Sequence, residues 1–108
     1  MAFTEDSVGG GFNSTNYVTI STGDANGRKI IKNVVVANVD TISHLVLIEF
    51  VRSGVAYRMF TVTLAPNDSL VQDCLVVLGD ANYTLRARLN EAAVTTQPHF
   101  VATLAQTA

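Results

Sequence analysis

The strongest structural signal is the stretch His44-Leu-Val-Leu-Ile-Glu-Phe-Val-Arg52, continued by Ser53-Gly54 and then by Val55-Ala-Tyr-Arg-Met-Phe-Thr-Val-Thr-Leu64. Two apolar runs flank a two-residue connection that contains glycine, which is typical of a β-hairpin with a primed turn. A central helix is the alternative interpretation. The density of Val, Ile, Phe and Thr favours strands, because β-branched and aromatic side chains suit a pleated surface.

Both faces of the first of these strands are apolar apart from one carboxylate. Alternate residues of a strand point to opposite sides, which groups Val46, Ile48 and Phe50 on one face and Leu45, Leu47 and Glu49 on the other. One face must enter the core. We expect the other face, with Leu45 and Leu47, to meet another subunit.

The same alternation extends outward along the chain. It predicts strands over residues 17–21, 28–37, 44–52, 55–64, 69–78 (with a bend near Asp73), 83–89 and 100–104. The connections are rich in Gly, Asn, Asp and Pro, as in Pro66-Asn-Asp68. Short strands at this spacing predict an all-β antiparallel sandwich, jelly-roll or immunoglobulin-like, of about seven or eight strands.

Residues 1–16 differ from the rest and contain the run Gly9-Gly-Gly11. Glycine loses much entropy on ordering, so we predict a flexible N-terminal arm, with the sandwich domain spanning residues 17–108 and folding without the arm. The arm would order on a neighbouring subunit, with Phe3, Val8 and Phe12 as its anchors. A plain disordered tail is the alternative.

Composition indicates one domain that associates with other chains. The chain has 108 residues, of which only 15% are charged, so part of its surface is expected to be covered by another subunit. A homo-oligomer is predicted, with a trimer favoured. The net charge of −2 argues against partners such as nucleic acid or an anionic membrane.

Targeting and redox signals are also absent from the sequence. Cys74 is the single cysteine, so no intrachain disulfide can form. The N-terminus lacks the basic and apolar regions of a secretory signal, and the apolar runs are too short to span a bilayer. We therefore expect the protein to be assembled in a cytoplasm.

A search for chemistry predicts no catalytic, metal or cofactor site. His44 and His99 have no neighbouring Cys or His at metal spacing, and Cys74 is expected to be a small buried hydrophobe. A weak divalent-cation site where Asp68, Asp73 and Asp80 meet is an alternative. The protein is therefore predicted not to be an enzyme.

Two surface features remain as candidate binding sites. Arg86 and Arg88 share the outward face of one predicted strand and could form ion pairs with a neighbouring chain. Tyr57 and Tyr83, with loop aspartates, could form a carbohydrate-binding platform. The absence of tryptophan counts against a sugar platform, which relies on large aromatic side chains.

From Ile30 to the C-terminus the chain resembles small β-sandwich virion proteins of tailed bacteriophages. The matching segments are Val34-Val-Val-Ala-Asn-Val-Asp40, His44-Leu-Val-Leu-Ile48, Gly54-Val-Ala-Tyr57, Phe60-Thr-Val-Thr-Leu-Ala-Pro-Asn-Asp-Ser-Leu70 and Leu78-Gly-Asp-Ala-Asn-Tyr-Thr-Leu85. The resemblance covers some three-quarters of the chain and implies no catalytic residues. The glycine-rich segment before Tyr17 departs from it.

The resemblance implies a structural role in the virion. It favours a capsid cement or decoration protein that stabilises the head by bridging capsid subunits, with the major capsid protein or other virion proteins as partners. A neck, tail, baseplate or fibre component is the alternative, and a carbohydrate-binding sandwich module comes after it.

Overall fold

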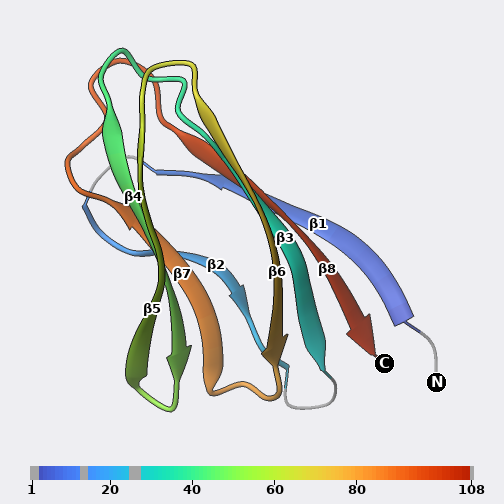
Figure 1. Cartoon of the computed structure of the whole chain (residues 1–108). Helices are drawn as coiled ribbons and strands as arrows, with labels where there is room; N and C mark the ends of the chain where they lie inside the picture. The colour runs from blue at the N-terminus through green and yellow to red at the C-terminus, as the bar shows by residue number, and fades with distance from the viewer. Residues whose placement is uncertain (1–2, 13–14, 25–27, 108) are drawn as a thin grey trace.

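The computed structural model describes residues 3–12, 15–24 and 28–107, which form two four-stranded antiparallel sheets (Figure 1). The strands are β1 (Phe3–Gly11), β2 (Val18–Thr22), β3 (Lys29–Ala37), β4 (His44–Arg52), β5 (Val55–Leu64), β6 (Ser69–Leu78), β7 (Tyr83–Leu89) and β8 (His99–Thr107). Sheet A has the order β1-β8-β3-β6 and sheet B the order β2-β7-β4-β5. The predicted all-β sandwich is confirmed.

The strand order selects the jelly roll from the two architectures that the sequence left open. Among the strands described, only β4 and β5 are neighbours both in the chain and in a sheet. The other strands pair with partners distant in sequence, as two interlocked Greek keys require. An immunoglobulin-like sandwich would instead pair further strands that follow each other in sequence.

Seven of the eight described strands lie where the sequence predicts them. Residues 44–52, 55–64, 69–78 and 83–89 are strands as predicted, β2 is displaced by one residue at both ends, and β3 begins one residue later than predicted. β8 is longer than the predicted 100–104. The bend expected near Asp73 coincides with a register shift between β3 and β6, where Asn33 pairs with Asp73 and Ile31 with Val76.

Backbone angles at two connections agree with the predicted turn chemistry. Ser53 and Gly54 have φ values of 50° and 82°, so the β4–β5 hairpin has the primed turn predicted for it. Asn67 has φ 64°, and the Asp68 N–H donates to the Ala65 carbonyl oxygen at 3.0 Å. Positive φ at the third position of this turn is typical of type II, with proline before it.

The segment predicted as a separate arm contributes a strand to the sandwich. β1 lies at the edge of sheet A and pairs with β8 over nine consecutive residues, from Phe3 opposite Thr107 to Gly11 opposite His99. The glycines have a packing reason, because a Cβ on Gly10 would lie 3.0 Å from the ring of Phe100. The predicted boundary between residues 16 and 17 therefore falls between β1 and β2, within the fold.

The core lies between the two sheets and follows the alternation of each strand. Its largest fully buried hydrophobic side chains, none of them exposed, are Phe12, Ile31, Ile48, Leu78, Leu85, Leu89, Val34, Val36 and Val46. Phe12, predicted as an arm anchor, packs in this core with its ring centroid 5.3 Å from that of Phe100. Its burial ties the end of β1 to the rest of the sandwich.

Candidate assembly surfaces

The outer face of sheet B carries a layer of charged and aromatic side chains. Arg86 donates from Nε and Nη2 to one Glu49 oxygen, at 3.1 and 3.0 Å, and its guanidinium lies 3.8 Å from the ring centroid of Tyr17. Arg88 lies over the same ring at 5.4 Å. The ion pair predicted between Arg86 and a neighbouring chain is thus made within the chain, to a strand-neighbouring carboxylate in register.

The electrostatics of this layer centre on Glu49. Burial raises the pKa of its carboxyl, but hydrogen bonds from Tyr17 and Arg86 and the charges of Arg86 and Arg58 outweigh burial and leave the pKa below its ordinary value. The Nε atom of Arg88 is buried and finds no acceptor among the described residues. The layer is thus largely satisfied by contacts within the chain.

This layer bears on the prediction that Leu45 and Leu47 contact another subunit. Leu47 is only 4% exposed although it lies outside the main core, and its cross-strand neighbours are Arg88 and Thr61. It is therefore not available to a partner, which corrects the prediction. Leu45 is half-buried and pairs with Thr63. Long arginine stems cover apolar surface while their heads reach water, and the sequence gives no direct sign of that cover.

The remaining predicted anchors lie on or near β1. Val8 is half-buried and packs against the core, opposite Ala102. Phe3 has a described backbone in β1, but its side chain lies outside the described residues, as does that of Cys74. The structure therefore brings Val8 and Phe12 into the sandwich itself, on the inner side of sheet A.

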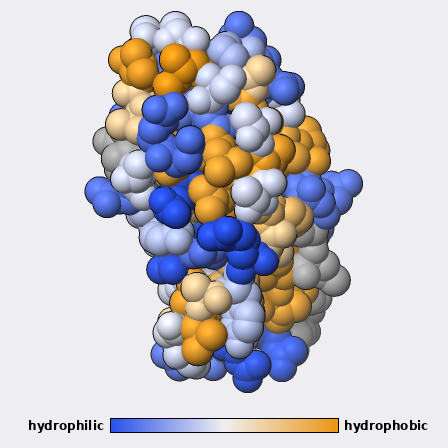
Figure 2. All heavy atoms as spheres, turned by 60° about the vertical axis from the view of Figure 1, so that its left-hand side comes forward, coloured by the Kyte–Doolittle hydropathy of each residue, from blue (hydrophilic) through white to orange (hydrophobic). Residues whose placement is uncertain are grey.

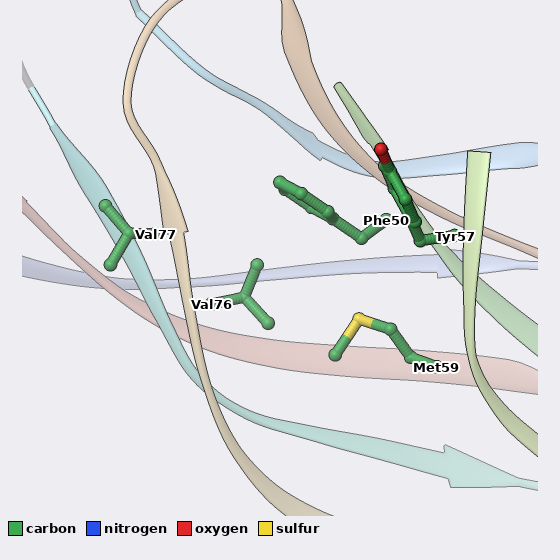
Figure 3. Close-up of a pocket in the computed structure, with 5 residues that line it drawn as sticks. All are labelled: Phe50, Tyr57, Met59, Val76 and Val77. Atoms are coloured by element: carbon green, nitrogen blue, oxygen red, sulfur yellow. The ribbon is translucent and has the colours of Figure 1, made fainter. Parts of the chain in front are cut away.

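An apolar groove opens on the side of the sandwich where β5 and β6 are the edge strands. It has a volume of about 280 Å³ and is lined by Phe50, Tyr57, Met59, Val76 and Val77. Figure 2 turns this side toward the viewer and shows apolar side chains gathered along its middle. In Figure 3, the Val76 side chain on β6 points toward Phe50 on β4 and Met59 on β5, whereas the side chain of the next residue, Val77, points away from them.

The groove is accessible because β5 and β6 are edge strands, each with a neighbouring strand on one side only. Tyr57 is 54% exposed, which is a high value for a side chain that lines an apolar hollow. Met59 is an extra residue in β5, between the pairs Ile48–Phe60 and Glu49–Arg58. Bulges of this kind interrupt an edge and disfavour addition of another strand. A partner would therefore engage the groove through side chains.

A buried polar network fastens the loops at the opposite end from the β4–β5 hairpin. Asp40 accepts hydrogen bonds from His44 at 2.7 Å and from the backbone N–H groups of Val94, Thr95 and Thr96 at 2.8, 2.9 and 3.2 Å. The pKa of the Asp40 carboxyl is held far below its ordinary range, first by His44 and then by N–H groups of Val94, Thr95 and Thr41, against the opposing effect of burial.

Asn38 extends this network to the next loop. Its amide donates to the carbonyl oxygens of Ile42 and Leu64, at 2.9 and 2.8 Å, and its side-chain oxygen accepts from the Asp40 N–H at 3.1 Å. His44 is thus a fully buried structural member of this network. Asn38 and Asp40 were not singled out, because loop residues of these types usually lie on the surface.

The network does not have the arrangement of a catalytic triad. His44 Nδ1 is buried and has no hydrogen-bond partner in the described part of the chain, so no described hydroxyl or thiol stands where a nucleophile would. Within the described residues, no three His, Cys, Asp or Glu side chains gather to hold a metal ion. Asp68 and Asp80 precede and follow β6, at opposite ends of that strand, so the suggested three-aspartate site does not form.

The two tyrosines suggested for a sugar platform lie on either side of Phe50. Its ring centroid is 6.4 Å from that of Tyr57 and 5.7 Å from that of Tyr83. Arg52 lies over the Tyr83 ring at 5.4 Å, and of the loop aspartates Asp80 adjoins Tyr83, because its carbonyl oxygen accepts from the Tyr83 N–H at 3.2 Å. Phe50 and Tyr57 line the apolar groove, whereas Tyr83 meets the Phe50 ring edge-on at 72°, so the rings do not form one flat platform. In the described residues no helix is long and apolar enough to cross a membrane.

Comparison with protein-family models and with curated proteins gives no match. Among solved structures, the chain is similar to a protein of Bacillus endospore appendages, described as disulfide-linked pili, at 16% identity and TM-score 0.56, over 98% of this chain and 88% of that one. It is also similar to the Drosophila NLP core, described for pentamer formation and histone binding, at 12% identity and TM-score 0.54, over 94% and 95%.

A third similar structure is the virus-like particle of Macrobrachium rosenbergii extra small virus. The identity is 12% and the TM-score 0.53, over 98% of this chain and 79% of that chain. At these identities the similarity establishes the shared fold only. Two of the three similar proteins are described as parts of pili or viral particles, and the other is described as a pentamer.

Proposed function

We propose that this chain is a non-enzymatic structural protein of a virion, and most specifically a capsid cement or decoration protein. Its partner would be the major capsid protein or another virion protein, bound at the open side of the sandwich. The observation that carries the proposal is the apolar groove between β5 and β6, in which Tyr57 is exposed. A groove with apolar walls gains stability when apolar side chains of a partner fill it.

The mechanism is bridging by buried area. A specific interface needs a total buried area on the order of 1,000 Å², and the groove would supply its apolar centre. On an icosahedral shell each such contact is repeated by symmetry. Modest individual contacts then add up to a large avidity when one assembly binds several capsid subunits at once.

The buried Asp40–His44 pair supports the non-enzymatic part of the proposal. All the described hydrogen bonds of the Asp40 carboxylate are to groups that it holds in place, namely His44 and backbone N–H groups of its own and neighbouring loops. Catalytic groups must reach a substrate, whereas both of these side chains are fully buried. The pair serves to fix loops.

A ring component of the neck, tail, baseplate or fibre is the second candidate, because the same groove would serve contacts around a ring. The two roles differ in copy number. A cement protein is expected in hundreds of copies per particle, and a ring component in about a dozen or fewer. Quantitative mass spectrometry of purified virions distinguishes them, and a chain missing from the particle would overturn both.

The groove itself is tested by binding to particles that lack the protein. Tyr57→Asp places a charge in the groove, and we expect it to reduce occupancy at least tenfold in a co-sedimentation assay. Val55→Asp is the matched control, since Val55 is 53% exposed on the same strand and does not line the groove. Equal loss with both variants, or no loss with Tyr57→Asp, would contradict the proposed contact.

A further inference from the structure

The outer face of sheet A carries a row of apolar positions that runs across all four strands. Val71 on β6 pairs with Val35 on β3, Val35 pairs with Val101 on β8, and Val101 pairs with Gly9 on β1. The neighbours Val34, Val36, Phe100 and Ala102 point into the core. Since alternate residues point to opposite faces, this row must point outward.

The row is accessible to solvent over much of its length. Val71 is 65% exposed and Val101 is 43% exposed, while Val35 between them is half-buried by its two neighbours. A second apolar row lies further along the same strands, where Ile30 pairs with Val77 and with Ala105. β-branched side chains in register form a flat, stiff surface, which suits packing against another sheet.

Charge on this face is nearly balanced within the chain. Lys32 and Glu5 form an ion pair with each other, with side chains that are 44% and 65% exposed. The proximity of Lys32 lowers the pKa of the Glu5 carboxyl, so the pair stays charged. Asp73 is the remaining described charge in this part of the sheet, and it lies on the edge strand β6. A partner with a strong charge of either sign would gain little here.

We propose that this face binds the same face of a second copy of the chain, in a two-fold dimer. A two-fold interface uses one patch twice, so the patch must complement itself. An uncharged ladder of valines does so, because each apolar row can lie on the equivalent apolar row. Sheets packed in this way lie about 10 Å apart, with side chains of the two faces interdigitated.

The size of the face is sufficient for a stable pair. Strands about 4.8 Å apart and rising about 3.3 Å per residue give a four-stranded, nine-residue face of roughly 19 by 30 Å. The two facing sheets of the dimer have a summed flat area of about 1,100 Å², and the protruding side chains make their solvent-accessible area larger than this. The flat area lies just below the lower limit of about 1,200 Å² for specific interfaces, and side-chain relief brings the accessible area up to it. The inference goes beyond the proposed function, because it does not require binding to a particle.

The test is the mass of the intact chain in solution, measured by sedimentation equilibrium between about 1 and 100 µM. The wild type is expected to contain two subunits, or an even number. Val71→Glu and Val101→Glu should each weaken the pair at least tenfold, because each places a charge in the buried face. Val94→Glu is the matched control, since Val94 is 66% exposed and lies in the β7–β8 connection.

The outcomes separate this inference from the proposed function. Dissociation by the Val71 and Val101 variants with an unchanged Val94 variant supports the dimer. A monomeric wild type, a trimer, or equal effects of all three substitutions would overturn it. If a glutamate variant loses its strand signal in circular dichroism, Val71→Thr keeps the β-branch and should still weaken the pair severalfold. Tyr57→Asp should leave the mass unchanged while reducing particle binding.

Discussion

The Nε2 atom of His44 lies 2.7 Å from Oδ2 of Asp40, and both side chains are fully buried. This contact joins the start of β4 to the β3–β4 connection, and through Asp40 it also joins the β7–β8 connection. Buried polar groups are costly to leave unpaired, so each member of the network depends on the others. The contact is therefore expected to govern stability rather than binding.

Asp40→Ala should lower the melting temperature by at least about 10 °C, because it leaves His44 and several loop N–H groups without their acceptor. Thermal unfolding followed by circular dichroism measures the change. Asp68→Ala is the control: Asp68 is exposed and its carboxylate accepts one hydrogen bond, from the N–H of the adjacent Ser69. A fall of the same size in both variants would argue against a special role for Asp40.

Acid should destabilise the protein through the same carboxyl. The pKa of Asp40 is lowered in the folded state, so its contribution is complete above the ordinary aspartate pKa of about 3.9 and is lost as the pH falls below it. We expect the melting temperature to fall steadily from pH 4 toward pH 2. Asp40→Asn, which cannot titrate, should show a shallower fall, measured over the same pH series. Parallel curves for the two proteins would contradict this assignment.

Gly10→Ala should reduce the free energy of unfolding by about 1 kcal/mol or more, because the new Cβ would lie 3.0 Å from a Phe100 ring that is itself packed on Phe12. Gly79→Ala is the control, since its Cβ would meet Tyr83 at an ordinary 3.7 Å. Urea unfolding of both variants measures the difference. Equal stability of the two would show that the Phe100 ring can move aside.

Gly10 also shows why the sequence predicted some strands and not β1. Alternation of apolar and polar residues is a local signal. Followed in both directions from the segment that begins at His44 and turns at Ser53, it predicts β2 to β8. A glycine run carries no alternation, and its fit against Phe100 depends on a strand far along the chain. Local composition therefore predicted flexibility where the structure has close packing.

The candidate surfaces were harder to predict for a related reason. Strand alternation treats Leu47 and Val35 alike, as apolar residues opposite the core face, and only the register reveals what covers each. Leu47 lies beside Arg88, whereas Val35 has valines on both sides. The groove likewise needs the strand order, because it exists only where β5 and β6 are left as edges.

Deletion of residues 1–16 should destabilise the fold, contrary to the expectation from the sequence. It removes β1, which leaves the edge of β8 unpaired, and it removes Phe12 from the core. Loss of a fully buried phenylalanine alone typically costs about 3–5 kcal/mol. Thermal unfolding measures the effect, and deletion of residues 1–2 is the control because it leaves β1 intact. A fully stable truncated chain would show that β1 is dispensable.

The Glu49–Arg86 pair should be coupled in energy, although it lies on an outer face. Arg86 is bound by Glu49 and stacks on Tyr17, and the Glu49 side chain is only 9% exposed. Single and double substitutions with Glu49→Gln and Arg86→Met form a cycle, from which we expect a coupling of about 1 kcal/mol, reduced by the 30% exposure of Arg86. Urea unfolding at low and high salt measures it. Because burial shields most of the pair from solvent and dissolved ions, the coupling should persist in high salt. A coupling that vanishes in high salt would mean that the pair behaves as an ordinary surface ion pair.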